Sequence, residues 1–353
     1  EEGWIPSAIV PGEGTLDLVL LNPGAAGPWS PGLELSPGPE PGLSLGGIFT
    51  DRDRDGDLDL LLGADRPFGL PPQPFYRNDG DLRLVNDAPE LGAALPISAM
   101  GIGSADLNAD GLPDYCFTDD RVHCLLSSDG GYVEGGLARG LDTGSAGPPS
   151  ADGIPWIWSG WGLELLDFDN DGALDAWAVG SPPPPIITDP SHPFAFPWPD
   201  QADQVWRGRA DGAFDYVGDE LGLDDPAPHY TIAAADLDRD GALDVVIGPY
   251  AGRPKLYMNR CTEGSWLQVD LTGPPGNVDG FGARVEVTTA GGIQLQELHN
   301  LRVSGQGPAV LHFGLGGAEA ADRVEVGWPD GSRTVAEDVP ARRRIDVRHA
   351  LAP

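Results

Sequence analysis

Four nine-residue runs place oxygen-bearing side chains at every second position. They are DRDRDGDLD from Asp51 (loop 1), DLNADGLPD from Asp106 (loop 2), DFDNDGALD from Asp167 (loop 3) and DLDRDGALD from Asp236 (loop 4). In such a run the side chains at positions 1, 3 and 5 point to a common centre, position 7 offers a backbone carbonyl, and position 9 returns a carboxylate. The Gly at position 6 permits the sharp turn. Together these groups supply the six or more oxygens that calcium prefers, so the sequence predicts calcium sites.

The predicted ligands stand at positions 1, 3, 5, 7 and 9 of each loop. They are Asp51, Asp53, Asp55, Asp57 and Asp59 in loop 1; Asp106, Asn108, Asp110, Leu112 and Asp114 in loop 2; Asp167, Asp169, Asp171, Ala173 and Asp175 in loop 3; and Asp236, Asp238, Asp240, Ala242 and Asp244 in loop 4. Without an ion, two carboxylates about 4 Å apart repel by roughly 4 kcal/mol at an effective dielectric near 20. One DxDxDG run also suits a solvated turn, because Asp and Gly are common turn residues. The fourfold recurrence favours about four Ca2+ ions with a chiefly structural role.

The loops recur at a spacing typical of repeat folds. Their first residues, 51, 106, 167 and 236, lie 55, 61 and 69 residues apart, which suggests a propeller or a solenoid. Each loop runs into an apolar strand, and three are followed by a hairpin signature around a DG turn: FYRNDGDLRLV, LLSSDGGYVEG and VWRGRADGAFDYV. Each unit thus holds about four short strands, as a propeller blade needs. A degenerate copy, IVPGEGTLDLVLLN from Ile9, lacks positions 1 and 3 and is expected to bind no ion.

The composition favours an all-β protein and excludes some partners. Gly and Pro, 51 and 36 of the 353 residues, punctuate short apolar runs such as LDLLLG and LDVVIG. Helical signals are nearly absent, and the best candidate is a single turn near residues 318–322. The formal net charge of −34 argues against nucleic acid, which needs a basic footprint. No apolar run approaches the roughly 20 residues of a membrane span.

The three cysteines fit none of the zinc spacings. Cys116 and Cys124 flank the polar turn FTDDRVH and could pair across two strands as a disulfide, with two buried free thiols as the alternative. Cys261 would then be unpaired or contact something outside the chain. Weak calcium sites make most sense where calcium is millimolar, so an extracellular or cell-surface location is expected. The sequence starts at Glu1 without a signal segment, which we interpret as a processed or trimmed chain.

The loops and the stretches before them (SLGGIFTDRD, AMGIGSADLN, GWGLELLDFD and TIAAADLDRD) resemble the FG-GAP or VCBS repeats of integrin-α-type β-propellers. Beyond residue 260, WLQVDLTGPPGNVDGFGARVEV and LHFGLGGAEAADRVEVGWPDGS resemble the ASPIC and UnbV domain that follows such repeats in CRTAC-like (cartilage acidic protein) secreted proteins. The resemblance implies an all-β, calcium-binding propeller over residues 1–262 and an ASPIC/UnbV-like domain over residues 263–353. Integrin relatives have seven blades, and five units are visible here. The C-terminal segment could be a separate sandwich or could complete the propeller.

Three other features have a structural and a functional reading. The segment 181–200, SPPPPIITDPSHPFAFPWPD, could present aromatic groups to a partner or fold back over the propeller. Trp156, Trp158 and Trp161 could stack on a sugar, although packing between blades is the preferred interpretation. The six histidines have no paired spacing, and His312 is expected to be structural. No GxSxG, HExxH, GxGxxG or P-loop motif is present.

These observations predict a secreted binding or adhesion module whose partner is a protein or a glycan. One alternative is an extracellular enzyme, active on glycans for example, that uses the propeller channel or the domain interface. Another is a structural surface protein whose acidic exterior binds further calcium. The fold alone does not decide among them.

Overall fold

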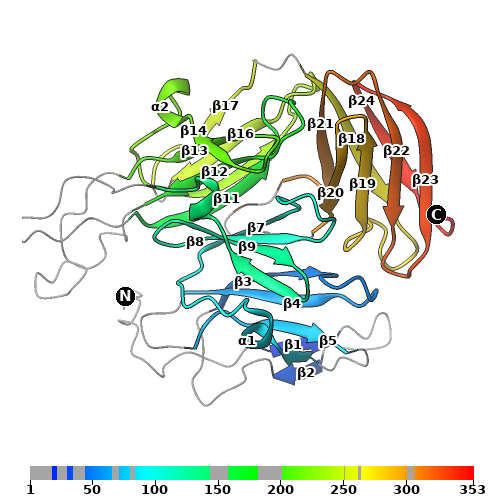
Figure 1. The fold of residues 1–353 in the computed structure, drawn as a ribbon, viewed down its shortest axis with the longest axis horizontal. Coiled ribbons are helices and arrows are strands. Elements are labelled where there is room, and N and C mark those ends of the chain that lie inside the picture. Colours follow the sequence, from blue (N-terminus) through cyan, green and yellow to red (C-terminus); the bar gives the residue numbers. More distant parts are fainter. Residues whose placement is uncertain are drawn as a thin grey trace, which may run out of the picture.

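The computed structural model describes residues 44–65, 71–79, 84–143, 158–181, 201–249, 251–260, 264–299, 305 and 307–353, and the backbone of 18–21 and 30–34. Within these ranges the chain is built almost wholly of strands (Figure 1), which confirms the predicted all-β class. Four earlier predictions lie mainly outside the described residues: the degenerate copy from Ile9, Trp156, Cys261 and the Pro-rich segment after Ser181.

Four consecutive antiparallel sheets hold the four loops. The first sheet contains β3 (Ser44–Thr50), β4 (Asp59–Ala64), β5 (Phe75–Asn78) and β6 (Leu84–Asn86), and the second contains β7 (Gly101–Ala105), β8 (Asp114–Thr118), β9 (Val122–Ser128) and β10 (Gly131–Glu134). The third sheet contains β11 (Gly160–Leu166), β12 (Asp175–Gly180), β13 (Gln204–Gly208) and β14 (Phe214–Tyr216). The fourth sheet contains β15 (His229–Ala235), β16 (Asp244–Pro249) and β17 (Lys255–Tyr257). In each sheet the strands are paired in chain order. Each loop therefore joins the first and second strands of its own sheet.

Neighbouring sheets pack face to face around shared apolar cores. One core joins Ile48 and Phe75 of the first sheet to Phe117 of the second. A second core joins the second and third sheets through Cys124 and Trp206, and a third core joins the third and fourth sheets. The second strands of the first three sheets, β4, β8 and β12, are buried along their whole length. For β8 and β12 the reason is that neighbouring sheets cover both faces of their sheets. This side-by-side arrangement is the one that the blade-like repeat predicts.

The remaining elements of this part are short. Two strands, β1 (Leu18–Leu21) and β2 (Ser30–Glu34), pair with each other. Single helical turns occur at α1 (Ala88–Leu91), at the 3-10 turn Leu137–Arg139 and at α2 (Gly218–Leu221). None of the described helices is long and apolar enough to cross a membrane.

The C-terminal segment is a two-sheet sandwich. One sheet has the order β21-β18-β24 and the other the order β20-β19-β22-β23. The strands are β18 (Ser265–Thr272), β19 (Arg284–Thr289), β20 (Gly292–Glu297), β21 (Val310–Gly316), β22 (Ala320–Gly327), β23 (Arg333–Pro340) and β24 (Arg343–Arg348). One apolar core, which includes Val269, Val285 and Phe313, lies between the two sheets.

One prediction about the C-terminal segment is wrong, and another concerns residues that the structure does not describe. The helical turn expected near residues 318–322 is wrong, because β22 begins at Ala320 and pairs along its length with β19 and β23. The predicted domain boundary at 262/263 falls among residues that are not described. Figure 1 shows the sandwich, coloured from ochre to red, standing at one end of the blade-like sheets.

Candidate metal centre

The four loops share one backbone conformation. Position 4 has a left-handed φ between 56° and 66°, and the Gly at position 6 has a φ between 81° and 97°. The position 4 residues are Arg54, Ala109, Asn170 and Arg239. A side chain at position 4 accepts a conformation that few residues other than Gly adopt, which costs roughly 1–2 kcal/mol. The repeated geometry shows that each loop turns at the same two positions, 4 and 6.

The carboxylate at position 1 closes each turn from inside. In loop 3, Gly172 N–H donates to Asp167 Oδ2 at 2.8 Å, and in loop 4 Gly241 N–H donates to Asp236 Oδ2 at 3.1 Å. Gly111 N–H donates to Asp106 in the same way in loop 2. These bonds hold one oxygen of the position 1 carboxylate toward the loop centre.

The carboxylate at position 9 ties the loop to the hairpin that follows it. In loop 3, Asp175 accepts from Phe168 N–H at 2.8 Å and from Gly208 N–H at 2.7 Å. The same two-sided pattern, with the amide at loop position 2 and an amide at or near the end of the third strand of the sheet, recurs at Asp59, Asp114 and Asp244. All four side chains are at most 1% exposed. Position 9 is therefore a structural clasp as well as a candidate ligand.

Three of the four loops bring carboxylates together. The ligand oxygens of each group lie within 4.8 Å of one another: Asp51, Asp53 and Asp55 in loop 1; Asp167, Asp169 and Asp175 in loop 3; and Asp236, Asp238 and Asp244 in loop 4. Oxygen-only clusters of this kind suit a hard cation such as calcium.

Loop 3 gives the clearest test of whether a cation fits. Asp167 is 3% exposed, and its Oδ1 is buried without a hydrogen-bond partner among the described residues. Burial raises the pKa of Asp167 to about 7 and that of Asp175 to about 9. Asp51 Oδ1 in loop 1 is also buried and unpartnered. A buried anionic oxygen without a donor is costly, and a cation at this point would satisfy it.

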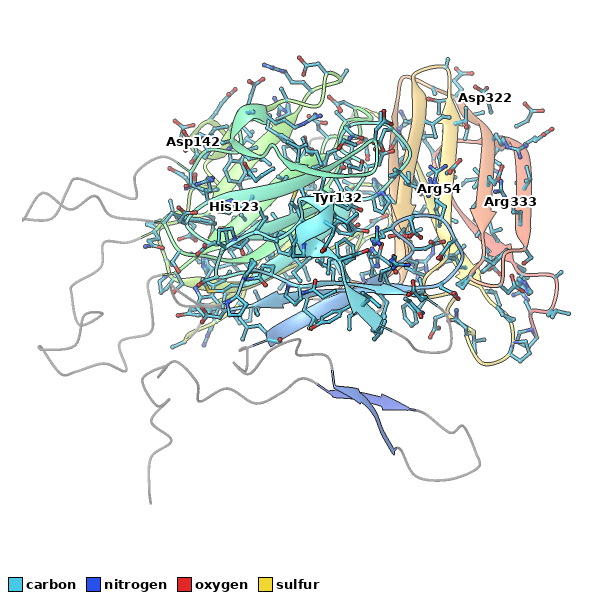
Figure 2. All side chains as sticks on the ribbon, turned by 60° about the horizontal axis from the view of Figure 1, so that its bottom comes forward. Arg54, His123, Tyr132, Asp142, Asp322 and Arg333 are labelled. Carbon is cyan, nitrogen blue, oxygen red and sulfur yellow. A yellow bond between two sulfur atoms is a disulfide. The ribbon has the colours of Figure 1, made fainter. Side chains whose placement is uncertain are left out.

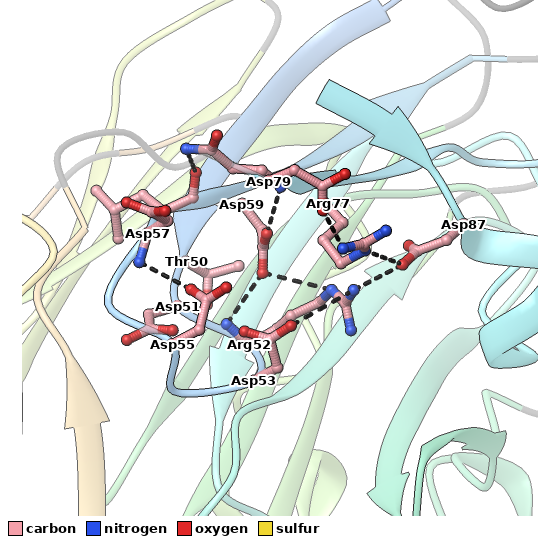
Figure 3. A network of polar contacts seen from close by, with 12 residues as sticks. Thr50, Asp51, Arg52, Asp53, Asp55, Asp57, Asp59, Arg77, Asp79 and Asp87 are labelled. Carbon is pink, nitrogen blue, oxygen red and sulfur yellow. Dashed lines mark hydrogen bonds and ion pairs between the residues drawn. The ribbon is translucent and has the colours of Figure 1, made fainter. Parts of the chain in front are cut away.

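In loop 1, the arginine at position 2 contacts several carboxylates (Figure 3). Arg52 is 7% exposed; its Nε is 3.3 Å from Asp59 Oδ2 and its NH2 is 2.7 Å from Asp87 Oδ2. Arg77 reaches the same Asp87 oxygen at 3.2 Å. Burial nevertheless raises the pKa of Asp59 to about 7. The guanidinium thus joins Asp59 to Asp87, and its NH2 also lies 3.8 Å from Asp53, one of the three carboxylates that lie together in this loop.

Loop 2 is arranged differently. Asn108 Nδ2 donates to Asp110 Oδ2 at 3.2 Å, and Ser127 Oγ donates to Asp110 at 2.7 Å and to Asp114 at 2.9 Å. The guanidinium groups of Arg54 and Arg284 both donate to the carbonyl of Gly111, and Figure 2 shows Arg54 beside the sandwich. Its candidate ligands are thus partly satisfied by internal donors. Guanidinium groups also pair with candidate ligands of loops 3 and 4: Arg207 Nε lies 2.9 Å from Asp169, and Arg260 contacts Asp238 and Asp240.

Sequence reasoning did not find every group that belongs to this region. Glu297 on β20 is buried against loop 1, accepting from Thr50 Oγ1 at 2.5 Å and from Asp51 N–H at 3.3 Å. Burial raises its pKa to about 7. A glutamate 246 positions from its partner has no local motif.

Asp119, Asp120 and His123 also lie close enough together to share an ion, although His123 already contacts Asp120 at 2.9 Å.

The other sequence candidates fall in structural positions. Trp158 is 2% exposed in the core between the second and third sheets, and Trp161 packs against Tyr230 with ring centroids 4.4 Å apart. Cys116 and Cys124 lie opposite each other on β8 and β9 and form a disulfide. A cavity of about 120 Å³ lies between loops 2 and 3 and β20, which is smaller than the roughly 300–1,000 Å³ of most ligand pockets.

Comparisons with solved structures give low similarity. BBS1N in complex with ARL6DN has a TM-score of 0.36 and 9% identity, over 84% of this chain and 69% of that chain. The V. cholerae biofilm matrix protein Bap1 has a TM-score of 0.30 and 10% identity, over 84% of this chain and 59% of that chain. The Bacillus licheniformis rhamnogalacturonan lyase PL11 has a TM-score of 0.30 and 13% identity, over 86% of this chain and 61% of that chain. TM-scores this low do not establish a shared fold.

Comparisons by sequence give one family match and one relative. Residues 273–352 match the family described as ASPIC and UnbV. Cartilage acidic protein 1 of Homo sapiens is 35% identical over 71 residues, which are 20% of this chain and 11% of that protein. The matched part thus spans about a ninth of that relative. The predicted ASPIC and UnbV resemblance is confirmed over residues 273–352, which lie in the C-terminal sandwich, and over 71 residues the chain is similar to a cartilage acidic protein.

Proposed function

We propose that this chain is a secreted calcium-binding β-propeller module that carries an ASPIC/UnbV domain and binds a protein or glycan partner. In this proposal residues 1–262 form the propeller part and residues 263–353 the C-terminal domain. The observation that carries calcium binding is loop 3, where an unpartnered oxygen of the 3% exposed Asp167 lies within a cluster of carboxylates. When bound, the ion would supply positive charge to oxygens that otherwise repel one another.

The role of calcium is chiefly structural in this proposal. The position 9 clasps connect each loop to its own sheet, so ordering a loop also orders the sheet. At millimolar calcium and a dissociation constant near 0.1 mM, each site would contribute about 1.4 kcal/mol of stability. Three converging loops would contribute roughly 4 kcal/mol, a large share of a typical domain's net stability.

Export is supported by the Cys116–Cys124 disulfide, because such bonds persist in oxidising compartments. The enzyme and the structural surface protein remain alternative predictions.

The experiment is metal analysis of the purified chain combined with thermal unfolding in calcium, magnesium and EDTA. We expect calcium to co-purify or bind on titration and EDTA to lower the melting temperature. Asp171→Asn should remove one ion and lower the melting temperature in calcium. Asp129→Asn, which removes the same charge at an exposed turn outside the loops, should change neither. An unchanged melting curve after verified ion removal would show that calcium is not structural.

A further inference from the structure

All four loops lie against one element, the C-terminal sandwich. Loop 1 contacts Glu297 of β20, and the carbonyl of Gly111 in loop 2 accepts from Arg284 of β19. In loop 3, the carbonyl of Asn170 accepts from Gly316 N–H at 2.9 Å. In loop 4, Asp236 Oδ2 accepts from Gln268 Nε2 of β18 at 2.9 Å. The loops thus form the blade side of a domain interface.

Asn170 is the centre of this interface. It is 0% exposed and stands at position 4 of loop 3. Its Nδ2 donates to the carbonyl of Gly241 in loop 4 at 2.9 Å, and its Oδ1 lies 2.7 Å from Nε2 of His312 in the sandwich. One side chain therefore joins two loops and the C-terminal domain.

The contact between the sandwich and the loops is close as well as polar. A Cβ placed on Gly314 of β21 would lie 1.8 Å from Asp167 Oδ2, and one placed on Gly241 would lie 1.8 Å from the indole nitrogen of Trp266. Protein atoms cannot approach to that distance, so these two glycines allow the sandwich to reach the loops. A change in loop shape at Asp167 or Gly241 would be transmitted directly to β21 and β18.

The charge across the interface depends on what the loops hold. Glu297 is 8% exposed and faces loop 1, where Asp51 carries a buried, unpartnered oxygen. Asp167, also buried, faces β21 from loop 3. With empty loops these carboxylates are enclosed by docking, which is costly for unpaired charges. A cation in each loop would add two positive charges beside these carboxylates and reduce this cost.

From this arrangement we propose that calcium occupancy of the loops controls docking of the ASPIC/UnbV sandwich onto the blades. Loaded loops hold the sandwich in the position described here, and loss of the ions releases it while both parts stay folded. The inference rests on the proposed calcium binding and adds a specific interdomain consequence. By linkage, docking in turn increases the affinity of the loops for calcium.

The test is hydrogen exchange of the full chain in calcium and in EGTA, well below the melting temperature in EGTA. The reporter is the amide of Gly316, whose acceptor lies across the interface. Amides in the β22–β23 pair report on the folding of the sandwich, and amides in the β8–β9 pair report on the blades. We expect EGTA to speed exchange at Gly316 by roughly tenfold or more, with both control pairs still protected and the radius of gyration from X-ray scattering increased.

Two variants at position 4 compare Asn170 with an exposed residue at the same position of another loop, and neither disturbs the turn. Asn170→Gly keeps the left-handed backbone and deletes the contacts to His312 and Gly241. Arg239→Gly makes the same change at position 4 of loop 4, where the side chain is exposed. We expect Asn170→Gly to raise the calcium concentration for half-maximal Gly316 protection roughly fivefold, the effect of about one hydrogen bond. Arg239→Gly should leave that concentration unchanged.

The outcomes separate this inference from calcium binding itself. If calcium binds and stabilises the chain but Gly316 exchanges equally in EGTA, the docking inference is wrong and the calcium proposal stands. If Gly316 and both control pairs lose protection together, the two parts unfold as one unit and the inference is also wrong. If calcium does not bind at all, the proposed function fails first.

Discussion

His312 Nε2 lies 2.7 Å from Asn170 Oδ1, so a histidine of the C-terminal sandwich meets the residue at the apex of loop 3. The imidazole is 7% exposed, and its ring stacks at 17° against Trp266. Burial lowers the pKa of His312 to about 4. The neutral imidazole is therefore the form that the interface holds.

This lowered pKa predicts a loss of stability in acid. The folded chain keeps His312 neutral, whereas the unfolded chain binds a proton near pH 6.5. The stabilising contribution is complete above pH 6.5 and is lost as the pH falls from 6.5 toward 4. Urea unfolding at saturating calcium should show the wild-type chain losing up to roughly 3 kcal/mol more over this range than His312→Gln. Parallel pH profiles for the two proteins would contradict the assignment.

The two roles inferred for the loop carboxylates predict different variant phenotypes. Asp175→Asn places an amide group against backbone donors at the clasp, which should cost about 1–3 kcal/mol even at saturating calcium. Asp169→Asn, at position 3 of the same loop, should weaken calcium binding and regain nearly full stability when calcium is raised. Chemical denaturation across a calcium series measures both effects. If excess calcium rescues Asp175→Asn as fully as Asp169→Asn, position 9 has no separate structural role.

Loop 2 should bind calcium more weakly than the other three loops. Asn108 and Ser127 already donate to Asp110, and two guanidinium groups lie at Gly111. Calorimetric titration should give about three tighter sites and one weaker site, and Asn108→Asp should strengthen the weak one. The variant should also be less stable than wild type in EDTA, because it adds a carboxylate beside Asp110. Four equivalent sites in the wild-type chain would count against this reading of loop 2.

The disulfide should stabilise the second sheet and resist reduction while the chain is folded. Cys116 and Cys124 are both 0% exposed and lie eight positions apart in the sequence. Closing so short a loop stabilises a protein by about 2–3 kcal/mol in the chain-entropy model. A phosphine reductant should lower the unfolding free energy by that amount only after an unfolding and refolding cycle. A Cys116→Ala, Cys124→Ala double variant is the control and should not respond to the reductant.

The sequence was most informative where the physics is local. A nine-residue loop contains its own turn residues and most of its candidate ligands, so the loops and the strand after each one could be predicted from spacing alone. The pairing of Cys116 with Cys124 is local in the same sense, because one tight turn places them opposite each other. The ASPIC and UnbV resemblance also depended on contiguous residues, 273–352.

Non-local contacts could not be predicted in this way. Glu297 and Asp51 are 246 positions apart, and Asn170 and His312 are 142 apart. Their meeting depends on how the sandwich packs onto the blades, which no local pattern encodes. The helical turn expected near residues 318–322 failed for a related reason: small residues there suit a turn, but pairing with β19 and β23 made the segment a strand.

The sandwich lies over part of loop 3, which affects how fast an ion could leave that loop. Asp167 is 3% exposed and Asn170 is fully enclosed, while Asp53 and Asp55 of loop 1 are exposed to solvent. In the proposal above, an ion in loop 3 would be covered by the sandwich beside Asp167 and open to solvent beside the exposed Asp171, so it would leave more slowly than an ion in loop 1. A brief fall in calcium would then empty loop 1 before loop 3.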